Sequence, residues 1–182
     1  MKEPDFPDNE AQRIKDLHSL DILDTEPEER FDRVTRIAKH LFDVPIAVVS
    51  LVDNHRQWFK SCIGLPVRET ARNVSFCGHV INDDGPFIIN DATKDPRFLD
   101  NPLVMGEPFI RFYAGVPLVY HNQSKLGTLC IIDTKPRELT MQQMADLVDL
   151  AKVAEQELEA TIQATLDPCL LYTSPSPRDR YG

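Results

Sequence analysis

The stretch that decides the fold is residues 46–64, "IAVVSLVDNHRQWFKSCIG". β-Branched and other apolar residues fill its first half, as is typical of a buried strand, and Pro45 before it stops helix growth. The polar pair "NH" makes a turn, and the second half returns, so the two runs predict an antiparallel hairpin. Because successive side chains of a strand alternate, we expect Trp58 and Phe59 on opposite faces, with one of them exposed.

Two amphipathic helices are predicted before this hairpin. Ile14, Leu17 and Leu20 recur at helical spacing, and residues 28–42, "EERFDRVTRIAKHLF", repeat the pattern. Thr25 is the expected N-cap of the second helix, because Pro27 and acidic residues follow it in what would be the first turn.

Three further strands and a long helix are predicted after the hairpin. The strand candidates are residues 86–91, 112–120 and 125–133. The helix begins after Thr140, a plausible N-cap, and runs to residue 166. Five strands broken by helices and loops indicate an α+β domain.

An apolar stripe follows the final helix at alternating steps of three and four residues. Its members are Met144, Leu147, Ala151, Ala154, Leu158, Ile162 and Thr165. Two interpretations are open: a parallel pair of such helices that leads into a following segment, or a single helix that covers one face of the sheet.

Composition limits the classes of function. The formal net charge of -9 argues against nonspecific binding to nucleic acid or to anionic membranes. No apolar run approaches the length of a membrane span, and the first residues lack the pattern of a secretory signal. The four cysteines have irregular spacing, which fits a reducing compartment, so we expect a cytoplasmic protein.

The end of the chain breaks with the pattern before it. Residues 169–182, "CLLYTSPSPRDRYG", resemble a translated sequencing adapter, and the alternative is a genuine Pro/Ser linker. We therefore expect a disordered start over residues 1–9, one domain over residues 10–166 and a non-native tail over residues 167–182. An output domain that followed would then be missing.

The segment "SFCGHVI", residues 75–81, contains the most reactive candidate. If it starts a short helix, Ser75 is the N-cap and accepts from the amide near Cys77 or Gly78. Unpaired amides in that turn would favour a thiolate at Cys77. A spacing of two points Cys77 and His79 to different sides of a helix, and a lone C-x-H is a weak metal signal. The alternative is that Cys77 packs as a small hydrophobe and His79 bonds locally.

Several segments together resemble a bacterial GAF domain, of the type found at the N-terminus of sensor histidine kinases and diguanylate cyclases. They are residues 10–81, "INDATKDPRFLDNPLV" (89–104), "IRFYAGVPL" (110–118) and "LGTLCIIDTKPREL" (126–139). The resemblance implies a GAF-like central antiparallel sheet of five or six strands. It also implies terminal helices on one face, and a pocket under loops and short helices on the other. Such domains usually work as homodimers whose helices pass a signal onward.

Seven polar groups are the predicted ligand-binding residues. They are Ser75, Cys77, His79, Asp91, Arg97, Arg111 and Tyr113. A guanidinium of Arg97 or Arg111 would suit a carboxylate or phosphate, and Asp91 an amine or hydroxyl. The structural alternative for each is open. Asp91 would then cap a turn, Arg97 would pair with Asp95 or Asp100, and Arg111 and Tyr113 would cover the rim of an edge strand.

The resemblance therefore implies a regulatory module that binds a small molecule or senses redox state, with no catalytic residue and no metal of its own. It names no cofactor, because the signatures of the members that bind cyclic nucleotides or bilins are not found here. Two rivals stay open: a free methionine sulfoxide reductase of GAF type that uses Cys77, and a ligand-free dimerisation module.

Overall fold

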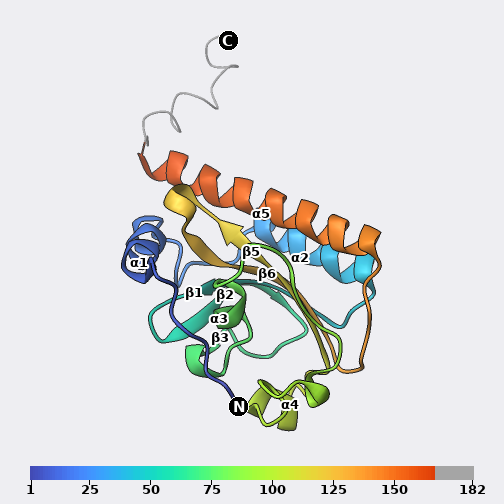
Figure 1. Ribbon diagram of the computed structural model, residues 1–182. Coiled ribbons are helices and arrows are strands. Elements are labelled where there is room, and N and C mark those ends of the chain that lie inside the picture. Colours follow the sequence, from blue (N-terminus) through green and yellow to red (C-terminus); the bar gives the residue numbers. More distant parts are fainter. Residues whose placement is uncertain (167–182) are drawn as a thin grey trace.

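The computed structural model describes the backbone of residues 1–166 and the side chains of residues 1–161 (Figure 1). The expected tail, residues 167–182, lies outside the described residues, and so does the adapter-like stretch within it. In chain order the elements are α1 (Glu10–Ser19), α2 (Glu29–Phe42), β1 (Ile46–Val52), β2 (Arg56–Ile63), β3 (Glu69–Ala71), α3 (Cys77–Val80), β4 (Phe87–Ile89), α4 (Pro102–Met105), β5 (Phe112–Val119), β6 (Lys125–Asp133) and α5 (Met141–Leu166). Short 3₁₀ turns lie at Arg72–Val74, Ala92–Lys94 and His121–Gln123.

The six strands form one antiparallel sheet in the order β3-β2-β1-β6-β5-β4. This confirms the α+β prediction, including the hairpin of β1 and β2. The strand that sequence reasoning missed is β3, whose three residues, Glu69–Ala71, pair with Arg56–Trp58 at the edge of the sheet. They are too few to show an alternating pattern.

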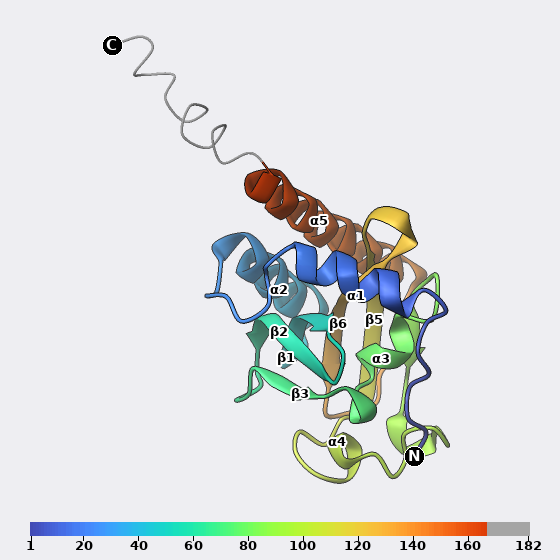
Figure 2. The same ribbon diagram turned by 90° about the vertical axis from the view of Figure 1, so that its left-hand side faces the viewer.

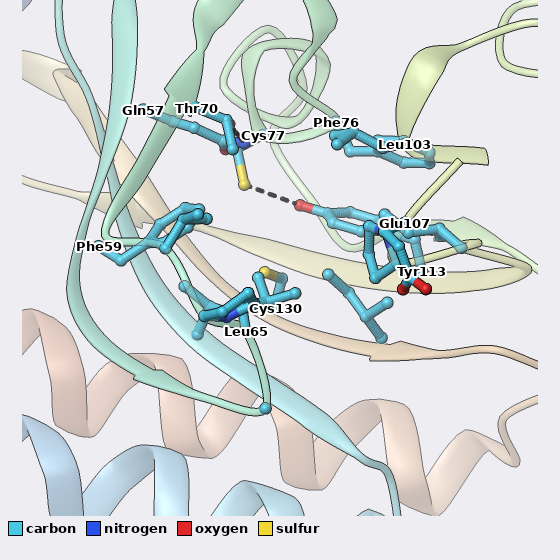
Figure 3. Close-up of a pocket in the computed structure, with 17 residues that line it drawn as sticks. Gln57, Phe59, Leu65, Thr70, Phe76, Cys77, Leu103, Glu107, Tyr113 and Cys130 are labelled. Atoms are coloured by element: carbon cyan, nitrogen blue, oxygen red, sulfur yellow. Dashed lines mark hydrogen bonds between the residues drawn. The ribbon is translucent and has the colours of Figure 1, made fainter. Parts of the chain in front are cut away.

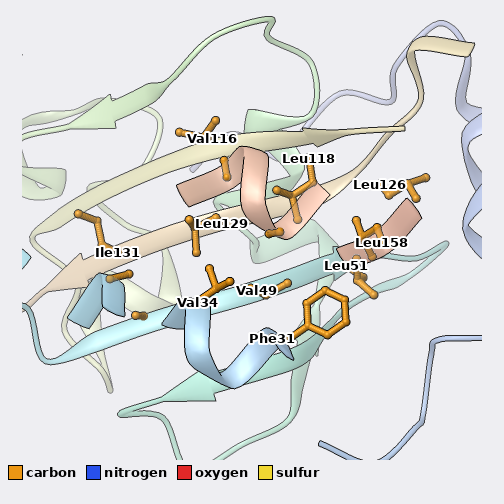
Figure 4. Close-up of a cluster of buried hydrophobic side chains, with 14 of the residues drawn as sticks. Phe31, Val34, Val49, Leu51, Val116, Leu118, Leu126, Leu129, Ile131 and Leu158 are labelled. Atoms are coloured by element: carbon orange, nitrogen blue, oxygen red, sulfur yellow. The ribbon is translucent and has the colours of Figure 1, made fainter. Parts of the chain in front are cut away.

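One face of the sheet is covered by α2 and α5 (Figure 1). Phe31 and Val34 of α2 and Leu158 of α5 pack on Val49 of β1 and Leu129 of β6, among other residues (Figure 4). Four members of the apolar stripe of α5 are at most 1% exposed: Leu147, Ala151, Ala154 and Leu158. In the described turns the stripe therefore packs onto this helix-side core, as the interpretation with a single covering helix required.

The opposite face is covered by α3, α4 and loops (Figure 2). Phe76, Val80 and Phe98 pack there against Tyr113 of β5 and Cys130 of β6. A single layer of strands thus separates two hydrophobic clusters, which we call the helix-side core and the pocket-side core.

Trp58 and Phe59 lie on opposite faces, in the helix-side and the pocket-side core respectively. They are only 4% and 3% exposed, so the expectation that one would be exposed is wrong. The reason is that both faces of β2 are covered, and the guanidinium of Arg68 lies 5.5 Å from the ring of Trp58.

The predicted helix caps have different outcomes. Thr140 caps α5 as predicted, because its hydroxyl accepts from the backbone amide of Gln143 at 3.0 Å. In return, the backbone amide of Thr140 donates to the side-chain oxygen of Gln143 at 2.9 Å. The N-cap position of α2 belongs to Glu28, so the prediction for Thr25 is wrong. The Thr25 hydroxyl instead donates to the carbonyl of Ile22 and accepts from the buried ammonium of Lys60.

Residues 1–9, the start of the chain, contact α3 and the segments next to it. The amide of Lys2 donates to the carbonyl of Arg97, and the side chain of Asn82 donates to the carbonyl of Asp5. Pro4 packs on Gly78, where a Cβ atom would come within 2.7 Å of its ring.

Buried charges attach α1 to the sheet. Arg13 is 0% exposed and donates to the carbonyl of Val52 at 2.6 Å. Both Arg13 and Arg72, which is 2% exposed, donate to the two carboxylate oxygens of Glu10. One carboxylate therefore neutralises part of the charge of two buried guanidinium groups.

We expect Glu10→Gln to lower the free energy of unfolding at neutral pH by about 2–3 kcal/mol, because it leaves two buried cations without their counterion. Burial raises the pKa of Glu10, but the hydrogen bonds and charges of Arg72 and Arg13 outweigh it, so the pKa lies below 4.5. The carboxylate thus contributes stability that is present above pH 4.5 and is lost as the pH falls through the lowered pKa.

Urea titrations between pH 3 and pH 7 measure this effect. The loss of stability in acid should be smaller in Glu10→Gln than in the wild type. Glu29→Gln, which removes an exposed carboxylate paired with Arg36, is the matched control and should change little. Equal pH profiles for the wild type and Glu10→Gln would contradict the assignment.

A second prediction concerns the closest approach of two strands. A Cβ atom on Gly127 would lie 1.8 Å from the carbonyl oxygen of Ser50 and 2.8 Å from Cα of Leu51, both on β1. Gly127→Ala should therefore cost about 2 kcal/mol or more, because backbone atoms on both sides must move. Gly85→Ala, whose Cβ meets nothing within 4 Å, should stay within about 0.5 kcal/mol of the wild type in the same thermal or urea unfolding experiment.

Candidate functional site

A pocket of about 410 Å³ lies between the pocket-side face of the sheet and the segments that cover it (Figure 3). Its volume is within the range of about 300–1,000 Å³ that is usual for small-molecule sites. Its walls are Val48, Gln57, Phe59, Gly64, Leu65, Pro66, Val67, Thr70, Phe76, Cys77, Leu103, Glu107, Pro108, Ile110, Tyr113, Cys130 and Ile132. Most of these side chains are apolar.

Strand alternation builds the floor of the pocket. Cys130 and Ile132 of β6 line it, while Leu129 and Ile131, their neighbours in the chain, belong to the helix-side core. Val48 of β1 pairs with Cys130 in the register and lines the floor beside it. The period of two that characterises a strand therefore decides which residues can meet a ligand.

Gly64 lets the chain leave β2 and cover one side of the pocket. Its φ of +94° belongs to the region that favours glycine, and a Cβ atom there would lie 2.2 Å from the carbonyl oxygen of Pro45. The turn brings Leu65, Pro66 and Val67 into the wall.

The N-cap position of α3 belongs to Phe76, so the prediction of Ser75 as the N-cap is wrong, but the predicted hydrogen bond from the Gly78 amide to Ser75 is present. The Ser75 hydroxyl accepts from the amide of Gly78 at 3.0 Å and donates to the carbonyl of Arg72 at 2.7 Å. Ser75 is buried and both functions of its hydroxyl are used, so it braces the helix and does not line the pocket.

Cys77 points from α3 toward the sheet. Its sulfur lies 3.2 Å from the hydroxyl of Tyr113 (Figure 3). It also lies 3.1 Å from the hydroxyl of Thr128. His79 lies on another side of α3, where its ring packs edge-on against Phe98 at 4.9 Å. The expectation that Cys77 and His79 diverge is therefore confirmed.

The electrostatics of the cluster formed by Cys77, Cys130 and Tyr113 favour at most one negative charge on the three side chains. Burial raises the pKa of the Cys77 thiol, but hydrogen bonds from Cys130, Thr128, Tyr113 and Ser50 outweigh it and lower the pKa to about 7. The hydrogen bond between Cys130 and Cys77, together with burial, raises the pKa of the Cys130 thiol well above its usual value. Burial and the neighbouring thiols raise the pKa of Tyr113 as well. Any charge in the cluster therefore sits on Cys77.

A second thiol lies in the same pocket. Cys130 is buried in β6, and its side chain lines the pocket wall together with Cys77 (Figure 3). Cys62 in β2 is half-buried and does not line this pocket. Only the packing of α3 against β6 could have shown that these two thiols are close, because 53 positions separate residues 77 and 130 in the chain.

The polar side chains of the wall bind one another. Gln57 donates to the Thr70 hydroxyl at 2.5 Å, and its carbonyl oxygen accepts from Ser50 at 3.3 Å. Among the side chains of residues 1–161, the one buried nitrogen or oxygen atom without a hydrogen-bond partner is Nε of Arg72, which lies outside this pocket.

The predicted charged ligand contacts lie elsewhere. Arg97 forms two hydrogen bonds with the carboxylate of Asp95, and its guanidinium lies 5.1 Å from the ring of Phe87. Arg111 donates to the carbonyls of Val104 and Ile110. Neither side chain lines the pocket.

Asp91 and His79 also have local roles. Asp91 accepts from the amide and the hydroxyl of Thr93 and so caps a 3₁₀ turn. His79 bonds the carbonyl of Lys2, and burial lowers the pKa of its ring. Of the seven predicted ligand-binding residues, the structure thus brings two, Cys77 and Tyr113, into the pocket wall.

The residues that sequence reasoning missed are mainly apolar. Phe59, Leu65, Leu103 and Ile110 line the pocket, yet in a sequence they cannot be distinguished from ordinary core positions. Glu107, the carboxylate in the wall, follows α4 in a loop that carried no recognisable motif.

Within residues 1–166, no three His, Cys, Asp or Glu side chains converge closely enough to hold a metal ion. None of the helices over the same residues combines the length and the apolar character needed to cross a bilayer.

Comparison with known proteins assigns the fold. A sequence model of the GAF domain matches residues 26–158. A cyclic di-GMP phosphodiesterase from Pseudomonas aeruginosa is 45% identical over 137 residues, which make up 75% of this chain and 23% of that protein. This chain therefore spans less than a quarter of the length of that relative.

Solved structures agree with the assignment. The free methionine-R-sulfoxide reductase of Neisseria meningitidis, in complex with its substrate, has a TM-score of 0.61 at 19% identity and covers 90% of this chain and 99% of its own. The GAF domain of an Acinetobacter phosphoenolpyruvate-protein phosphotransferase has a TM-score of 0.58 at 19% identity, over 85% of this chain and 96% of its own. Likeness at such identity concerns the fold alone. Since the family match covers well over half of the 182 residues, the chain belongs to the GAF domain family.

Proposed function

We propose that this GAF domain is the sensor module of a bacterial signal transduction protein, which binds a small molecule in the pocket and relays its presence through the flanking helices. One observation carries the proposal: the strands that form the floor of the pocket also form the surface on which α2 and α5 pack. A ligand on one face of β1 and β6 is thus one strand layer away from the helices.

Neighbouring residues of β6 face opposite sides of the sheet. Cys130 and Ile132 face the pocket. Leu129 and Ile131 alternate with them and face the helices. A shift of β6 that accommodates a ligand must also move the side chains against which Leu158 of α5 packs. The ligand can bias the helix packing only by the difference between its affinities for the two arrangements.

The output that receives the signal is part of the proposal. A histidine kinase or an enzyme of cyclic di-GMP turnover, such as a diguanylate cyclase, fits the resemblance. The phosphodiesterase relative favours the second class, since this chain corresponds to 23% of it. We further propose a cytoplasmic homodimer through the outer faces of the helices, where Ile37 and Leu41 of α2 and Val153 of α5 are 44%, 50% and 43% exposed.

Within the pocket we propose Cys77 and Tyr113 as ligand contacts. Both line the wall and lie within hydrogen-bond distance of each other. Ser75, His79, Asp91, Arg97 and Arg111 are proposed to hold α3 and the loops in place, because each already has local hydrogen-bond partners.

A thermal-shift screen against small metabolites tests the sensor proposal. Compounds that raise the melting temperature should lose this effect in Leu103→Trp, which puts a large ring into the pocket from α4. Leu99→Trp is the matched control, because it makes the same substitution at an exposed position outside the pocket wall and outside the proposed dimer face. The compounds should also change amide hydrogen exchange in α5. Compounds that stabilise the wild type and leave exchange in α5 unchanged would contradict the relay.

A thiol-dependent reductase is the second candidate, and the presence of two thiols in one pocket favours it. In that reaction the Cys77 thiolate would take the oxygen of a sulfoxide, which releases the sulfide and leaves a sulfenic acid on Cys77. The Cys130 thiol would then form a disulfide with Cys77 and release water, and an added dithiol would reduce the disulfide.

We expect no turnover of free methionine sulfoxide in the presence of dithiothreitol. The amino acid carries a carboxylate, and the pocket wall contains no cation to pair with it. Methionine release measured by chromatography provides the test. Turnover that disappears in Cys77→Ser and Cys130→Ser, and persists in Cys62→Ser, would establish the reductase in place of the ligand sensor.

A further inference from the structure

We infer that the pocket takes an uncharged, largely apolar small molecule, and that it excludes anions such as nucleotides, phosphates and carboxylates. This inference rests on the proposed sensor function and specifies the chemical class of its ligand. It is carried by three features of the pocket: the absence of a cation in the wall, the pairing of its polar atoms, and a carboxylate with apolar neighbours.

The first feature is the composition of the wall. Among the described residues that line the pocket, none is Lys, Arg or His. The cations next to wall residues in the chain have other partners: Arg56 pairs with Asp24 and Lys60 with Glu28. The guanidinium of Arg68 lies 5.5 Å from the ring of Trp58, and Arg111 donates to backbone carbonyls. An anion that entered would lose its hydration without gaining an ion pair.

The second feature is that the polar groups of the wall other than the carboxylate of Glu107 already have partners. Gln57 is bonded to Thr70 and Ser50, and Cys77 is bonded to Tyr113 and Thr128. A polar ligand would have to break these bonds to form its own, whereas an apolar ligand leaves them intact. The remaining surface, such as Phe59, Leu65 and Ile110, gains from contact with apolar atoms.

The third feature is Glu107. This exposed carboxylate lines the pocket and has no ion pair or hydrogen bond with any described side chain. Two apolar side chains near Glu107 in the chain are exposed: Met105 is 68% and Phe109 is 42% exposed. Val67, in the loop after β2, is 45% exposed and also lines the pocket. A negative charge next to apolar groups repels anions while it leaves neutral molecules unaffected.

The same features argue against cyclic di-GMP as the ligand of this pocket, although a relative is a phosphodiesterase of that nucleotide. A cyclic dinucleotide carries two phosphates, and proteins usually bind phosphate through Arg, Lys or helix N-termini. The wall contains neither cation. The nucleotide is therefore assigned to the output side of signalling and not to the sensor pocket.

Two fluorescent dyes with one aromatic framework test the inference. N-phenylnaphthylamine is neutral, and anilinonaphthalene sulfonate is the same molecule with one sulfonate added. We expect the neutral dye to bind the 182-residue chain tighter than the sulfonate by about tenfold or more, measured as fluorescence titrations at low salt.

Matched variants locate the binding. Leu103→Trp and Leu65→Trp, from different segments of the wall, should each weaken the neutral dye, and Leu99→Trp at an exposed position outside the wall should not. Circular dichroism identifies a variant that does not fold, and the other variant then decides. Glu107→Lys should tighten the sulfonate more than the neutral dye and so narrow the difference between them. Glu138→Lys makes the same charge change at an exposed position outside the pocket wall, and should have little effect on either dye.

Equal or tighter binding of the sulfonate, lost in the Trp variants, would overturn the ligand class and leave the sensor proposal intact. The inference would also be overturned if neither Leu65→Trp nor Leu103→Trp weakened the binding of the dye. Hydrogen exchange in α5 separates the two proposals. A neutral dye that binds in the pocket without any change in α5 supports the ligand class and contradicts the relay.

Discussion

The alternation of side chains along the central strands is the constraint on which the rest of this structure depends. Each of β1, β5 and β6 is buried on both faces, and the buried apolar side chains of these strands divide between the helix-side core and the pocket-side core. A shift of register by one residue would exchange Leu129 with Cys130 and bring the thiol under the helices. The close approach of Gly127 to Ser50 fixes β6 against β1 in one register. Pocket and helix surface are thus specified together.

The two cores differ in how they are held. Arginines fasten the helices to the sheet and to one another: Arg13 reaches the carbonyl of Val52, Arg30 of α2 donates to the carbonyl of Glu157 in α5, and Arg137 binds the carbonyl of Phe42 at the end of α2. The pocket-side core is closed by short helices and by loops with few strand bonds. Long helices cover the face through which the signal would be relayed, and loops and short helices cover the face on which a ligand would bind. Loops are in general more mobile than long packed helices. This arrangement suits a sensor, because α2 and α5 can respond as one body.

Much of the fold could be predicted from the sequence, and much less of the site. The hairpin at 46–64 and the helix after Thr140 have long periodic patterns, so their prediction succeeded. The edge strand β3 is three residues long, and Thr25 lost the cap position because Lys60 and Ile22 bind its hydroxyl. The choice of Arg97 and Arg111 as ligand contacts followed residue type, yet loop bracing and anion binding use the same guanidinium geometry. Apolar wall residues gave no signal, since a pocket wall and a packed core have the same composition.

The chemistry of the wall also limits how a signal is generated. With its polar atoms paired internally, the pocket can distinguish ligands mainly by shape and by the exclusion of charge. Burial of apolar surface is not directional, so a ligand gains about as much in either arrangement of the sheet unless one arrangement fits it better. The fit is decided where the wall is least regular, at Leu65 beyond Gly64 and at Leu103 in α4. Adjustment of these segments to the outline of a ligand would displace Phe59 of β2 and Ile110 just before β5, which belong to the same pocket-side core. In the proposed sensor, the discriminating contacts would therefore lie in the covering segments, and the strand layer would convert their displacement into a change in helix packing.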